Sequence, residues 1–329
     1  MQAHSETRIQ EMKQVSMKKK KISTFAVELK KVRKYRALVL MALPGLLYLL
    51  INNYLPMFGI VIAFKDINFA KGIFGSDWVG LKNFEYLFKT TDAYIITRNT
   101  LLYNITFILL NTGIAIALAI MLNEIRKRYL SRMYQTLILL PFLISMVIVG
   151  YLVLGFLDVE NGFMNKILLP MLGLDPISWY SETKYWPWIL TIVSVWKGVG
   201  NLCIIYLAAI IGIDNEYYEA ATIDGANRWQ QIRKIMIPLI APVITIMTLL
   251  AIGRIFYSDF GLFYQVPLNT GVLMPVTNTI DTYVYRALIN LGDIGMSSAA
   301  GLYQAFVGFI LVIISNAVVR KYNKDNALF

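Results

Sequence analysis

Residue types that most catalytic sites require are scarce in this sequence. Its 329 residues include one cysteine and one histidine. Because Cys203 is alone, no disulfide can form within the chain. Because His4 is alone, a histidine-based metal site and a Ser-His-Asp triad are both excluded. The sequence also lacks the Gly-x4-Gly-Lys-Ser/Thr loop that cradles nucleotide phosphates, which excludes nucleotide binding of that kind.

Charged residues are scarce as well. They make up 16% of the chain and hydrophobic residues 57%, a balance too apolar for an ordinary soluble globule. Six apolar runs are each long enough to cross a bilayer as a helix. They cover residues 38–63, 100–122, 133–157, 186–211, 235–256 and 301–319. Because open strands cannot satisfy their amides in lipid, we predict an all-α polytopic membrane protein with six transmembrane helices.

The basic residues predict how these helices are oriented. Segments on one side of the predicted bundle hold 21 of the 31 lysines and arginines, and segments on the other side hold eight. The basic side consists of residues 1–36, 123–132, 213–234 and 320–329. Because basic loops stay on the cytoplasmic side of a membrane, both termini are predicted to be cytoplasmic.

A basic tail, residues 1–36, precedes the first span. Its eleven lysines and arginines and three glutamates account for +8 of the net charge of +11. A basic run beside a membrane favours contact with anionic lipid over nucleic acid. Pro44 and Pro56 predict a kink in the first span. The predicted domains are this tail, a six-helix membrane domain over residues 37–322 and a short cytoplasmic tail at 323–329.

A polar stretch, Glu216 to Pro238, separates the fourth and fifth spans on the basic side. Asp214 is suited to cap the start of a short helix that runs through Asp224, because its carboxylate can accept the free amides of the first turn. Gly225 supplies the left-handed residue that ends this helix. A second helical run is predicted over residues 226–236, so the sequence predicts two short helices joined by a glycine turn.

This stretch resembles the EAA loop of binding-protein-dependent ABC importer permeases. Glu219-Ala220-Ala221, Gly225 and Ile237-Pro238 stand at the spacing of that motif, with isoleucine where the family usually has leucine before the proline. Three further stretches resemble the carbohydrate branch of the family: Tyr206-Leu207-Ala208, Asp224-Gly225-Ala226 and the external loop from Trp78 to Phe84.

The resemblance implies a type I, MetI-like permease fold with a cytoplasmic coupling helix, in a bacterial cytoplasmic (inner) membrane. It implies a non-catalytic subunit of an ATP-driven importer, which forms half of the pathway for an oligosaccharide or polysaccharide. A second homologous permease, two ATPase subunits and an extracellular or periplasmic solute-binding protein would complete the assembly. This chain would bind no cofactor and no metal, because ATP and magnesium belong to the ATPase.

In that family the coupling helix sits in a cleft of the ATPase. Tyr217 lies three and four residues before Ala220 and Ala221, so it is predicted to share a helix face with these small residues. Glu216 and Glu219 offer carboxylates to basic groups of the ATPase. The full set expected to couple the two subunits is Glu216, Tyr217, Glu219, Ala220, Ala221, Asp224, Gly225 and Pro238.

Lys197 is a charged residue near the middle of the fourth span, where an unpartnered charge is costly. Asn201 follows one helical turn later, and Trp196 precedes the lysine. One hypothesis places these three residues along the translocation pathway, in contact with sugar hydroxyls or carboxylates. The alternative is a structural lysine that snorkels outward or bonds to a neighbouring helix.

An aromatic-rich external run lies before the last span, at residues 258–267. It resembles polysaccharide and oligosaccharide permeases of the LplB type, in which such a loop faces the solute-binding protein. The candidates for docking are Asp259, Phe260, Phe263, Tyr264 and Gln265. A simple loop packed on the helix bundle is the alternative.

Two other classes of membrane protein are considered. An ion-coupled secondary transporter needs acidic or histidine relays within its spans, and the six predicted spans contain no aspartate or glutamate. A membrane enzyme needs a cluster of catalytic groups, and the external acids are scattered along the sequence. Neither alternative explains the EAA-type spacing.

Overall fold

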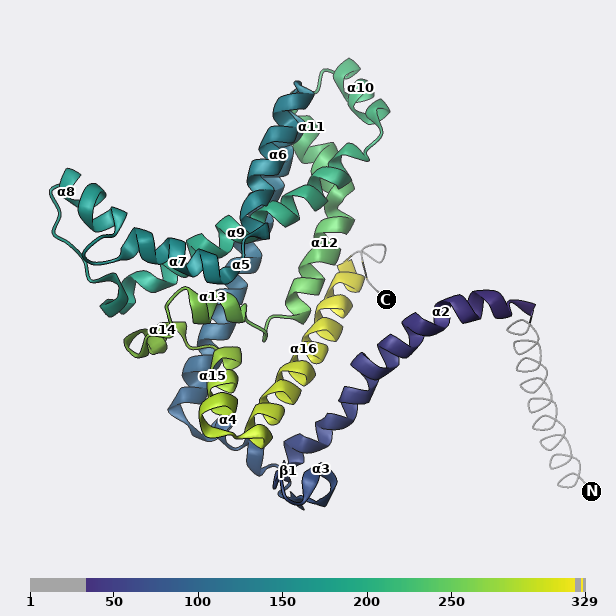
Figure 1. Ribbon diagram of the computed structural model, residues 1–329. Helices are drawn as coiled ribbons and strands as arrows, with labels where there is room; N and C mark the ends of the chain where they lie inside the picture. The colour runs from purple at the N-terminus through teal and green to yellow at the C-terminus, as the bar shows by residue number, and fades with distance from the viewer. Residues whose placement is uncertain (1–33, 323–326, 328–329) are drawn as a thin grey trace, which may run out of the picture. The chain divides into compact units, whose positions relative to one another are not determined.

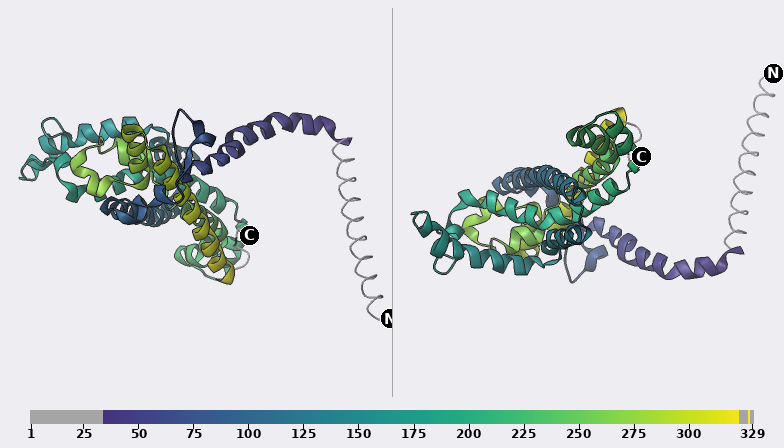
Figure 2. Two further views of the ribbon diagram at one scale, coloured as in Figure 1. Left: turned by 90° about the horizontal axis from the view of Figure 1, so that it is seen from below. Right: turned by 90° about the horizontal axis from the view of Figure 1, so that it is seen from above.

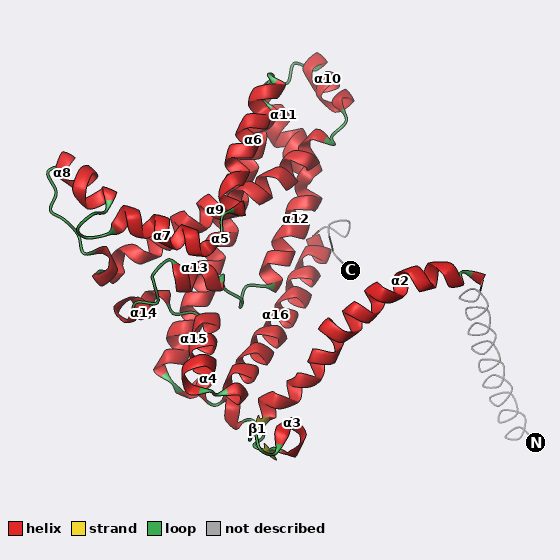
Figure 3. Ribbon diagram, in the orientation of Figure 1, coloured by secondary structure: helices red, strands yellow, loops and turns green. Residues whose placement is uncertain are grey.

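The computed structural model describes residues 34–322 and residue 327, and almost all of its secondary structure is helical (Figures 1 and 3). The predicted all-α class is confirmed. Of the predicted tails, 1–36 and 323–329, only positions 34–36 and 327 fall within the described residues. The chain divides into two units, residues 1–61 and 62–329, which are described separately.

The described part of the first unit is a single apolar helical run. It begins with α2 (Arg36–Leu49), which contains Pro44, and continues through a π-helical turn at Leu50–Tyr54. A 3-10 helix, Leu55–Phe64, then leads into the second unit. The departures from α-helical geometry fall where Asn52, Asn53 and Pro56 stand, and the Asn52 amide donates to the Tyr48 carbonyl oxygen.

The second unit contains the other long helices. They are α5 (Thr91–Asn123), α6 (Arg128–Leu143), α7 (Met146–Leu157), α9 (Trp186–Ile211), α12 (Ile237–Gly253) and α16 (Ile294–Tyr322). Short elements join them: β1 (Lys65–Asp66), α3 (Gly72–Gly75), β2 (Asp77–Trp78), α4 (Tyr86–Lys89), α8 (Leu169–Met171), α10 (Asn215–Ile223), α11 (Arg228–Gln231), α13 (Phe260–Gln265), α14 (Met274–Thr277) and α15 (Ile280–Arg286). The two strands pair antiparallel, with Lys65 opposite Trp78.

Among the described residues, five helices are long and apolar enough to cross a membrane. They cover Arg36–Phe64, Thr91–Asn123, Thr183–Ile211, Arg228–Gly253 and Ile294–Lys321. A sixth crossing is possible if α6 and α7 count as one span. The predicted fold class is therefore confirmed, although the fifth and sixth helices begin seven residues earlier than the apolar runs at 235 and 301 indicate.

The third predicted span, residues 133–157, is not one straight helix. It breaks between α6 and α7, whose axes meet at 97°. Ile144 and Ser145 have extended backbone conformations, and the Ser145 hydroxyl accepts a hydrogen bond from the Ile148 amide to start α7. Pro141 lies in the last turn of α6, where its missing amide weakens the helix. The apolar pattern of residues 133–157 did not predict the break.

The core of the second unit is built along α5 and α9. One cluster of buried side chains joins these helices to α7 and α13, and it includes Tyr103, Trp186 and Phe263. A second cluster joins their other halves to α12, with Cys203 buried as ordinary packing material. The α9 helix approaches α6 closely at Gly200, where a Cβ atom would lie 2.2 Å from the Ile138 carbonyl oxygen.

The two ends of the second unit carry different kinds of connection. The short helix α10 lies at one end, whereas α4 and α15 lie at the other (Figure 1). In the views along the vertical axis, α16 runs obliquely to the rest of the bundle (Figure 2). The bundle therefore presents one end with a short polar hairpin and an opposite end covered by folded connecting segments.

Candidate functional site

The helix α10 has well-defined caps at both ends. The Asp214 side chain accepts a hydrogen bond from the Glu216 amide at its start. At its end, the Gly225 amide donates to the Thr222 carbonyl (3.1 Å) and the Ala226 amide to the Ala221 carbonyl (2.8 Å). This is a Schellman motif, which requires a left-handed residue, and Gly225 has φ of +78°. The predicted cap, helix and glycine turn are confirmed.

The next helix begins with a reciprocal cap. The Asn227 side chain accepts from the Gln230 amide (2.9 Å), while the Gln230 side chain accepts from the Asn227 amide (2.8 Å). These two bonds satisfy amides that the first turn of α11 leaves unpaired. A π-helical turn at Ile232–Met236 carries α11 into α12, which has Pro238 in its first turn. Residues 228–253 thus form one continuous helix. It begins two residues later than the run predicted at 226–236, because Asn227 is its cap.

A buried glutamine ties these two helices together. The Gln231 amide nitrogen donates to the Thr222 hydroxyl (3.1 Å) on α10 and to the Ala226 carbonyl (3.3 Å) in the turn. Its side-chain oxygen accepts from Arg228 (2.8 Å). Because a buried amide is costly unless it is bonded, this network fixes α10 relative to α11. Gln231 was not among the predicted coupling residues, and its polar type alone gives no sign of burial.

An ion pair extends this network to the end of α5. The Arg228 guanidinium lies 3.0 Å from the Glu124 carboxylate, 104 residues earlier in the chain. Both side chains are partly open to solvent, so the pair adds little stability by itself. Its consequence is geometric, because it connects the α10–α11 hairpin to a third long helix.

The faces of α10 differ in exposure. Ala221 is only 9% exposed and packs against its own chain, as does half-buried Tyr218, whose pKa is raised by burial. Tyr217 is 56% exposed, whereas Ala221 is covered by the protein itself. The prediction that both residues lie on one face that docks against a partner is therefore wrong for Ala221. The predicted coupling residues that remain exposed are Glu216, Tyr217, Glu219, Ala220, Asp224, Gly225 and Pro238.

Two apolar side chains that were not predicted add to this surface. The side chain of Ile223 is 87% exposed and that of Trp229 is 68% exposed. Beside them, a pocket of about 380 Å³ opens between α10 and α11, lined in part by Glu219, Ile223 and Arg228. Exposed apolar groups beside carboxylates are typical of a protein-docking surface.

Lys197 reaches the break between α6 and α7. Its ammonium donates hydrogen bonds to three backbone carbonyls, those of Pro141 (3.3 Å), Phe142 (3.1 Å) and Ile144. The last carbonyls of a helix have no partner within that helix and attract a cation. The structural alternative therefore accounts for the lysine, and its role in the pathway stays a prediction.

The two neighbours of Lys197, Trp196 and Asn201, are both exposed on α9. Their place on the translocation pathway also stays a prediction.

The external run at 258–267 folds back onto the bundle. The Asp259 side chain caps α13 by accepting from the Leu262 amide (3.1 Å). Phe263 is 2% exposed and packs on Tyr103 with ring centroids 4.9 Å apart, so the structure places it in the core. Phe263 thus follows the packing alternative rather than the docking prediction.

The remaining docking candidates lie nearer the surface. Asp259 is exposed, and Phe260, Tyr264 and Gln265 are half-buried. The rings of Phe260 and Tyr264 stack at 4.9 Å, and Tyr285 from α15 packs against both. These side chains form an aromatic group at the boundary between core and solvent, and their docking role stays a prediction.

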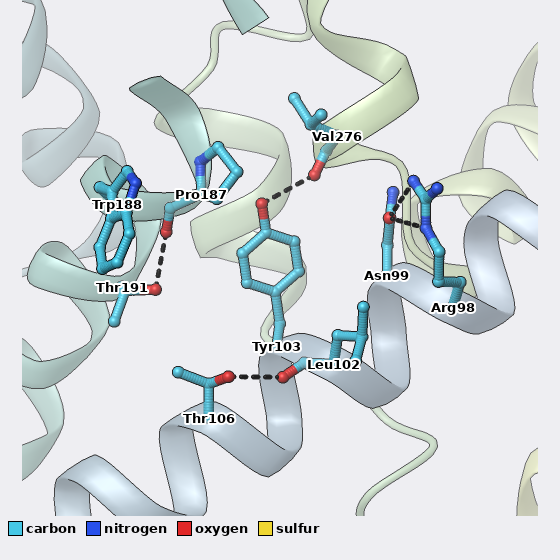
Figure 4. A pocket seen from close by; sticks show the side chains of 9 residues that line it. All are labelled: Arg98, Asn99, Leu102, Tyr103, Thr106, Pro187, Trp188, Thr191 and Val276. Atoms are coloured by element: carbon cyan, nitrogen blue, oxygen red, sulfur yellow. Dashed lines mark hydrogen bonds between the residues drawn. The ribbon is translucent and has the colours of Figure 1, made fainter. Parts of the chain in front are cut away.

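A pocket of about 380 Å³ lies where α5, α9 and α14 meet (Figure 4). Tyr103 points from α5 toward α14 and donates to the Val276 carbonyl (2.9 Å). Trp188 projects from the first turn of α9, and Arg98 stands at the opposite edge. The hydroxyls of Thr106 and Thr191 bond to backbone carbonyls of their own helices, which leaves a largely apolar pocket with one cation at its edge.

The α10 hairpin and the long helices that it joins match a known family of transport proteins. The model of the binding-protein-dependent transport system inner membrane component family matches residues 111–324. The chain belongs to this family. Its α10–α11 hairpin and α5 residues 111–123 lie within the matched range, and the resemblance noted in the sequence is confirmed.

Individual family members are similar over most of the chain. Protein LplB of Bacillus subtilis is 37% identical over 289 residues, which cover 88% of this chain and 90% of LplB. The polygalacturonan/rhamnogalacturonan transport system permease protein YteP of the same organism is 36% identical, covering 90% of this chain and 91% of YteP.

Solved structures agree with this assignment. A chain of a bacterial ABC transporter involved in the import of the acidic polysaccharide alginate superposes with a TM-score of 0.81 and 31% identity, covering 89% of this chain and 98% of that one. The same transporter in complex with a periplasmic protein bound to an alginate pentasaccharide gives a TM-score of 0.81 at 30% identity, with coverage of 90% and 98%.

Proposed function

We propose that this chain is one permease subunit of an ATP-driven importer, which moves a carbohydrate inward across a bacterial cytoplasmic membrane. The observation that carries the proposal is the α10 hairpin: a short capped helix held by three long helices, with exposed carboxylates and apolar groups on its outer side. In this proposal α10 seats in a cleft of a separate ATPase subunit. ATP and magnesium bind to that subunit, because the present sequence has no P-loop.

The attachments of α10 suit the transmission of movement. Its start is continuous with α9 through a three-residue connection, and its end is bonded to α11 through Gln231. The Arg228–Glu124 pair links the same hairpin to α5. A displacement of α10 by a closing ATPase dimer is therefore passed to three long helices at once, which couples hydrolysis to a change of access.

The composition of the outer surface of α10 suits contact with a protein partner better than contact with water alone. Glu216 and Glu219 supply charge that can pair with basic side chains, while Tyr217 and Ile223, with Trp229 of the neighbouring α11, supply apolar area. Apolar groups in the centre of an interface contribute most of its affinity, and the charges contribute specificity and encounter rate. We expect Ile223 and Tyr217 to contribute most of the affinity for the ATPase.

A carbohydrate cargo is supported by the relatives. YteP is described as a permease for polygalacturonan and rhamnogalacturonan, and the structural neighbour takes part in alginate import with a periplasmic binding protein. By the same reasoning, a solute-binding protein docks on the end opposite α10, and a second homologous permease supplies the other half of the pathway. The distribution of basic residues supports cytoplasmic N- and C-termini.

Site-specific cross-linking tests the docking of α10. Cys203 is the single cysteine of the chain and is buried, so a Cys203→Ser background accepts one new thiol. With Ile223→Cys in that background, we expect a short bifunctional cross-linker in native membranes to attach a P-loop ATPase identified by mass spectrometry. Val159→Cys, which is exposed between α7 and α8, is the matched control and should capture no ATPase.

An activity measurement accompanies the cross-linking. The tagged complex is purified gently and its ATP hydrolysis is measured with and without the solute-binding protein. Glu219→Arg should abolish the stimulation, whereas Asp175→Arg, the same charge reversal on the opposite side of the predicted membrane, should retain it. A solitary chain with no ATPase in either experiment would reject the importer and favour the ion-coupled secondary transporter.

A further inference from the structure

A second pocket lies on the opposite end of the unit from α10. It has a volume of about 480 Å³, which is within the range of sites for small ligands. The start of α5 forms one wall with Asp92, and α14 and α15 form the others with Asn278 and Arg286. Its lining includes two charged side chains, Asp92 and Arg286, whereas the mainly apolar pocket beside Trp188 has only Arg98. We call this second pocket the α14–α15 pocket.

The guanidinium of Arg286 in the pocket wall is held by uncharged hydrogen-bond acceptors. Arg286 is half-buried, and its guanidinium donates to the side-chain oxygens of Asn269 (2.8 Å) and Asn278. A third, longer bond reaches the Thr282 hydroxyl (3.4 Å). All three acceptors are uncharged. Among residues 34–322, no ion pair includes Arg286.

An arginine that is partly removed from water in this way costs some free energy unless an anion compensates for it. Charged side chains that are buried in proteins are normally paired with an opposite charge. Here the two asparagines fix the orientation of the guanidinium, and it makes no ion pair, although the Asp92 carboxylate lines another part of the same pocket. Asn269 adopts a left-handed conformation with φ of +49°, and Leu268 beside it has φ of +55°. Such conformations are uncommon for residues other than glycine, and they cluster at ligand-binding loops.

A second arginine is anchored on the other side of α14. The Arg98 guanidinium donates to the Pro275 carbonyl oxygen (3.2 Å), and Pro275 itself lines the α14–α15 pocket. Figure 4 shows Arg98 beside Asn99 at the edge of the neighbouring pocket. One short helix therefore separates two arginines that face adjacent pockets.

We propose that the α14–α15 pocket binds a carboxylate of an acidic saccharide, with Arg286 as the group that recognises the charge. The guanidinium plane can donate two parallel hydrogen bonds to a carboxylate, which a neutral sugar cannot replace. The amide of Asn290 and the carboxylate of Asp92 line the same pocket and can bond to sugar hydroxyls. This inference rests on the proposed function, and it narrows the cargo from carbohydrate in general to uronate-containing saccharides.

Equilibrium dialysis on the purified complex tests the proposal. The complex is reconstituted in lipid nanodiscs without the solute-binding protein, and two labelled probes are compared: trigalacturonate and its fully methyl-esterified form. The two probes have the same rings and the same hydroxyls, but only the first carries negative charge. We expect the acid to bind at least about tenfold more tightly, which corresponds to one charge-assisted hydrogen-bonded pair.

Three variants assign the preference to Arg286. Arg286→Gln should bind both probes with equal affinity, because the charge is gone. Arg286→Lys should keep a reduced preference for the acid, because it retains the charge and loses the two-pronged geometry. Lys166→Gln removes an exposed lysine from a different external segment and should behave as the wild type, which controls for general attraction of anions. If Arg286→Gln fails to reach the membrane, the severalfold loss in Arg286→Lys carries the test.

The possible outcomes separate this inference from the proposed function. Equal affinity of the wild type for both probes, no binding of trigalacturonate, or an acid preference that survives in Arg286→Gln would each overturn the inference. A preference that depends on Arg286 only when the solute-binding protein is added would also overturn it, because the arginine would then contact that protein. ATP hydrolysis that rises when the solute-binding protein is added to the same preparations upholds the importer whichever result is obtained. If no such rise occurs, the proposed function itself is removed.

Discussion

The two ends of the helix bundle carry connections that differ in length and in how they are held. At one end, α10 and α11 form a short hairpin whose backbone is fixed by local caps and whose outer side chains remain exposed. At the other end, the connection between α12 and α16 is about 40 residues long and folds into α13, α14 and α15. It places Leu262, Phe263 and Leu273 in the core.

This difference indicates where each end obtains its rigidity. The α10 hairpin is held by hydrogen bonds between residues close in sequence and by one buried glutamine, so its apolar groups stay available to a partner. The long connection between α12 and α16 is held by burial, so few of its aromatic groups stay available. A mutation should therefore affect coupling at the first end and stability at the second.

The largest expected effect is on the glycine turn after α10. Gly225→Val should abolish transport and ATPase stimulation, because a β-branched residue is strongly disfavoured at φ of +78° and the Schellman motif would open. The amount of protein in the membrane should change little. The matched control is Gly212→Ala, at φ of −75° with no neighbouring atom closer than 3.5 Å to a new Cβ atom. Normal uptake by Gly225→Val would show that the turn does not couple the subunits.

The second prediction compares one aromatic residue from each end. Phe263→Ala should destabilise the protein by about 3–5 kcal/mol, because it leaves a cavity beside Tyr103 and Phe107. Tyr217→Ala, at an exposed position, should leave the thermal stability nearly unchanged and lower the ATPase stimulation. Thermal unfolding of the purified complex and ATP hydrolysis measure the two effects. A stable Phe263→Ala protein would contradict the contrast between the ends.

The third prediction concerns the break between α6 and α7. Lys197→Met should lower the free energy of unfolding by about 1–3 kcal/mol, because carbonyls at the end of α6 lose their donor. The relative uptake of different saccharides should stay the same. Competition for uptake between neutral and acidic oligosaccharides, compared with the wild type, measures this. A changed preference would instead place Lys197 on the translocation pathway.

The smallest effect is a pH dependence at the external end. Burial raises the pKa of Tyr180 to about 12, and its hydroxyl donates to the Val266 carbonyl (3.3 Å). In the unfolded chain the phenol ionises near pH 10. The buried, neutral Tyr180 therefore contributes fully to the stability of the folded protein below pH 10, and this contribution is lost as the pH rises through 12. Tyr180→Phe should reduce the fall in melting temperature between about pH 9 and about pH 12, as measured by thermal unfolding. This range starts about one unit below the pKa of an unfolded tyrosine and ends near the pKa of folded Tyr180. An exposed replacement, Tyr129→Phe, should leave the profile as in the wild type.

The sequence predicted the α10 hairpin more accurately than the external end, and the reason lies in the range of the interactions. A cap at Asp214, a left-handed glycine at 225 and the spacing of Glu219 and Pro238 all depend on neighbouring residues. The burial of Ala221 and Gln231 does not, because it depends on α11 and the end of α5 folding against α10. For the same reason the aromatic residues of α13 could not be divided into buried and exposed ones from their pattern alone.

Composition, and spacing over a few turns, were enough to predict the apolar segments, their orientation by charge and the position of the EAA-type motif, because each depends on residues that are close in the chain. The tertiary structure was needed to show that the third segment bends by 97°, that Lys197 bonds to the carbonyls at that bend, and that Arg286 lines a pocket without forming an ion pair among residues 34–322. These features arise from contacts between residues that are far apart in the chain or from helices that approach after insertion. Such contacts cannot be predicted from the local periodicity of the sequence.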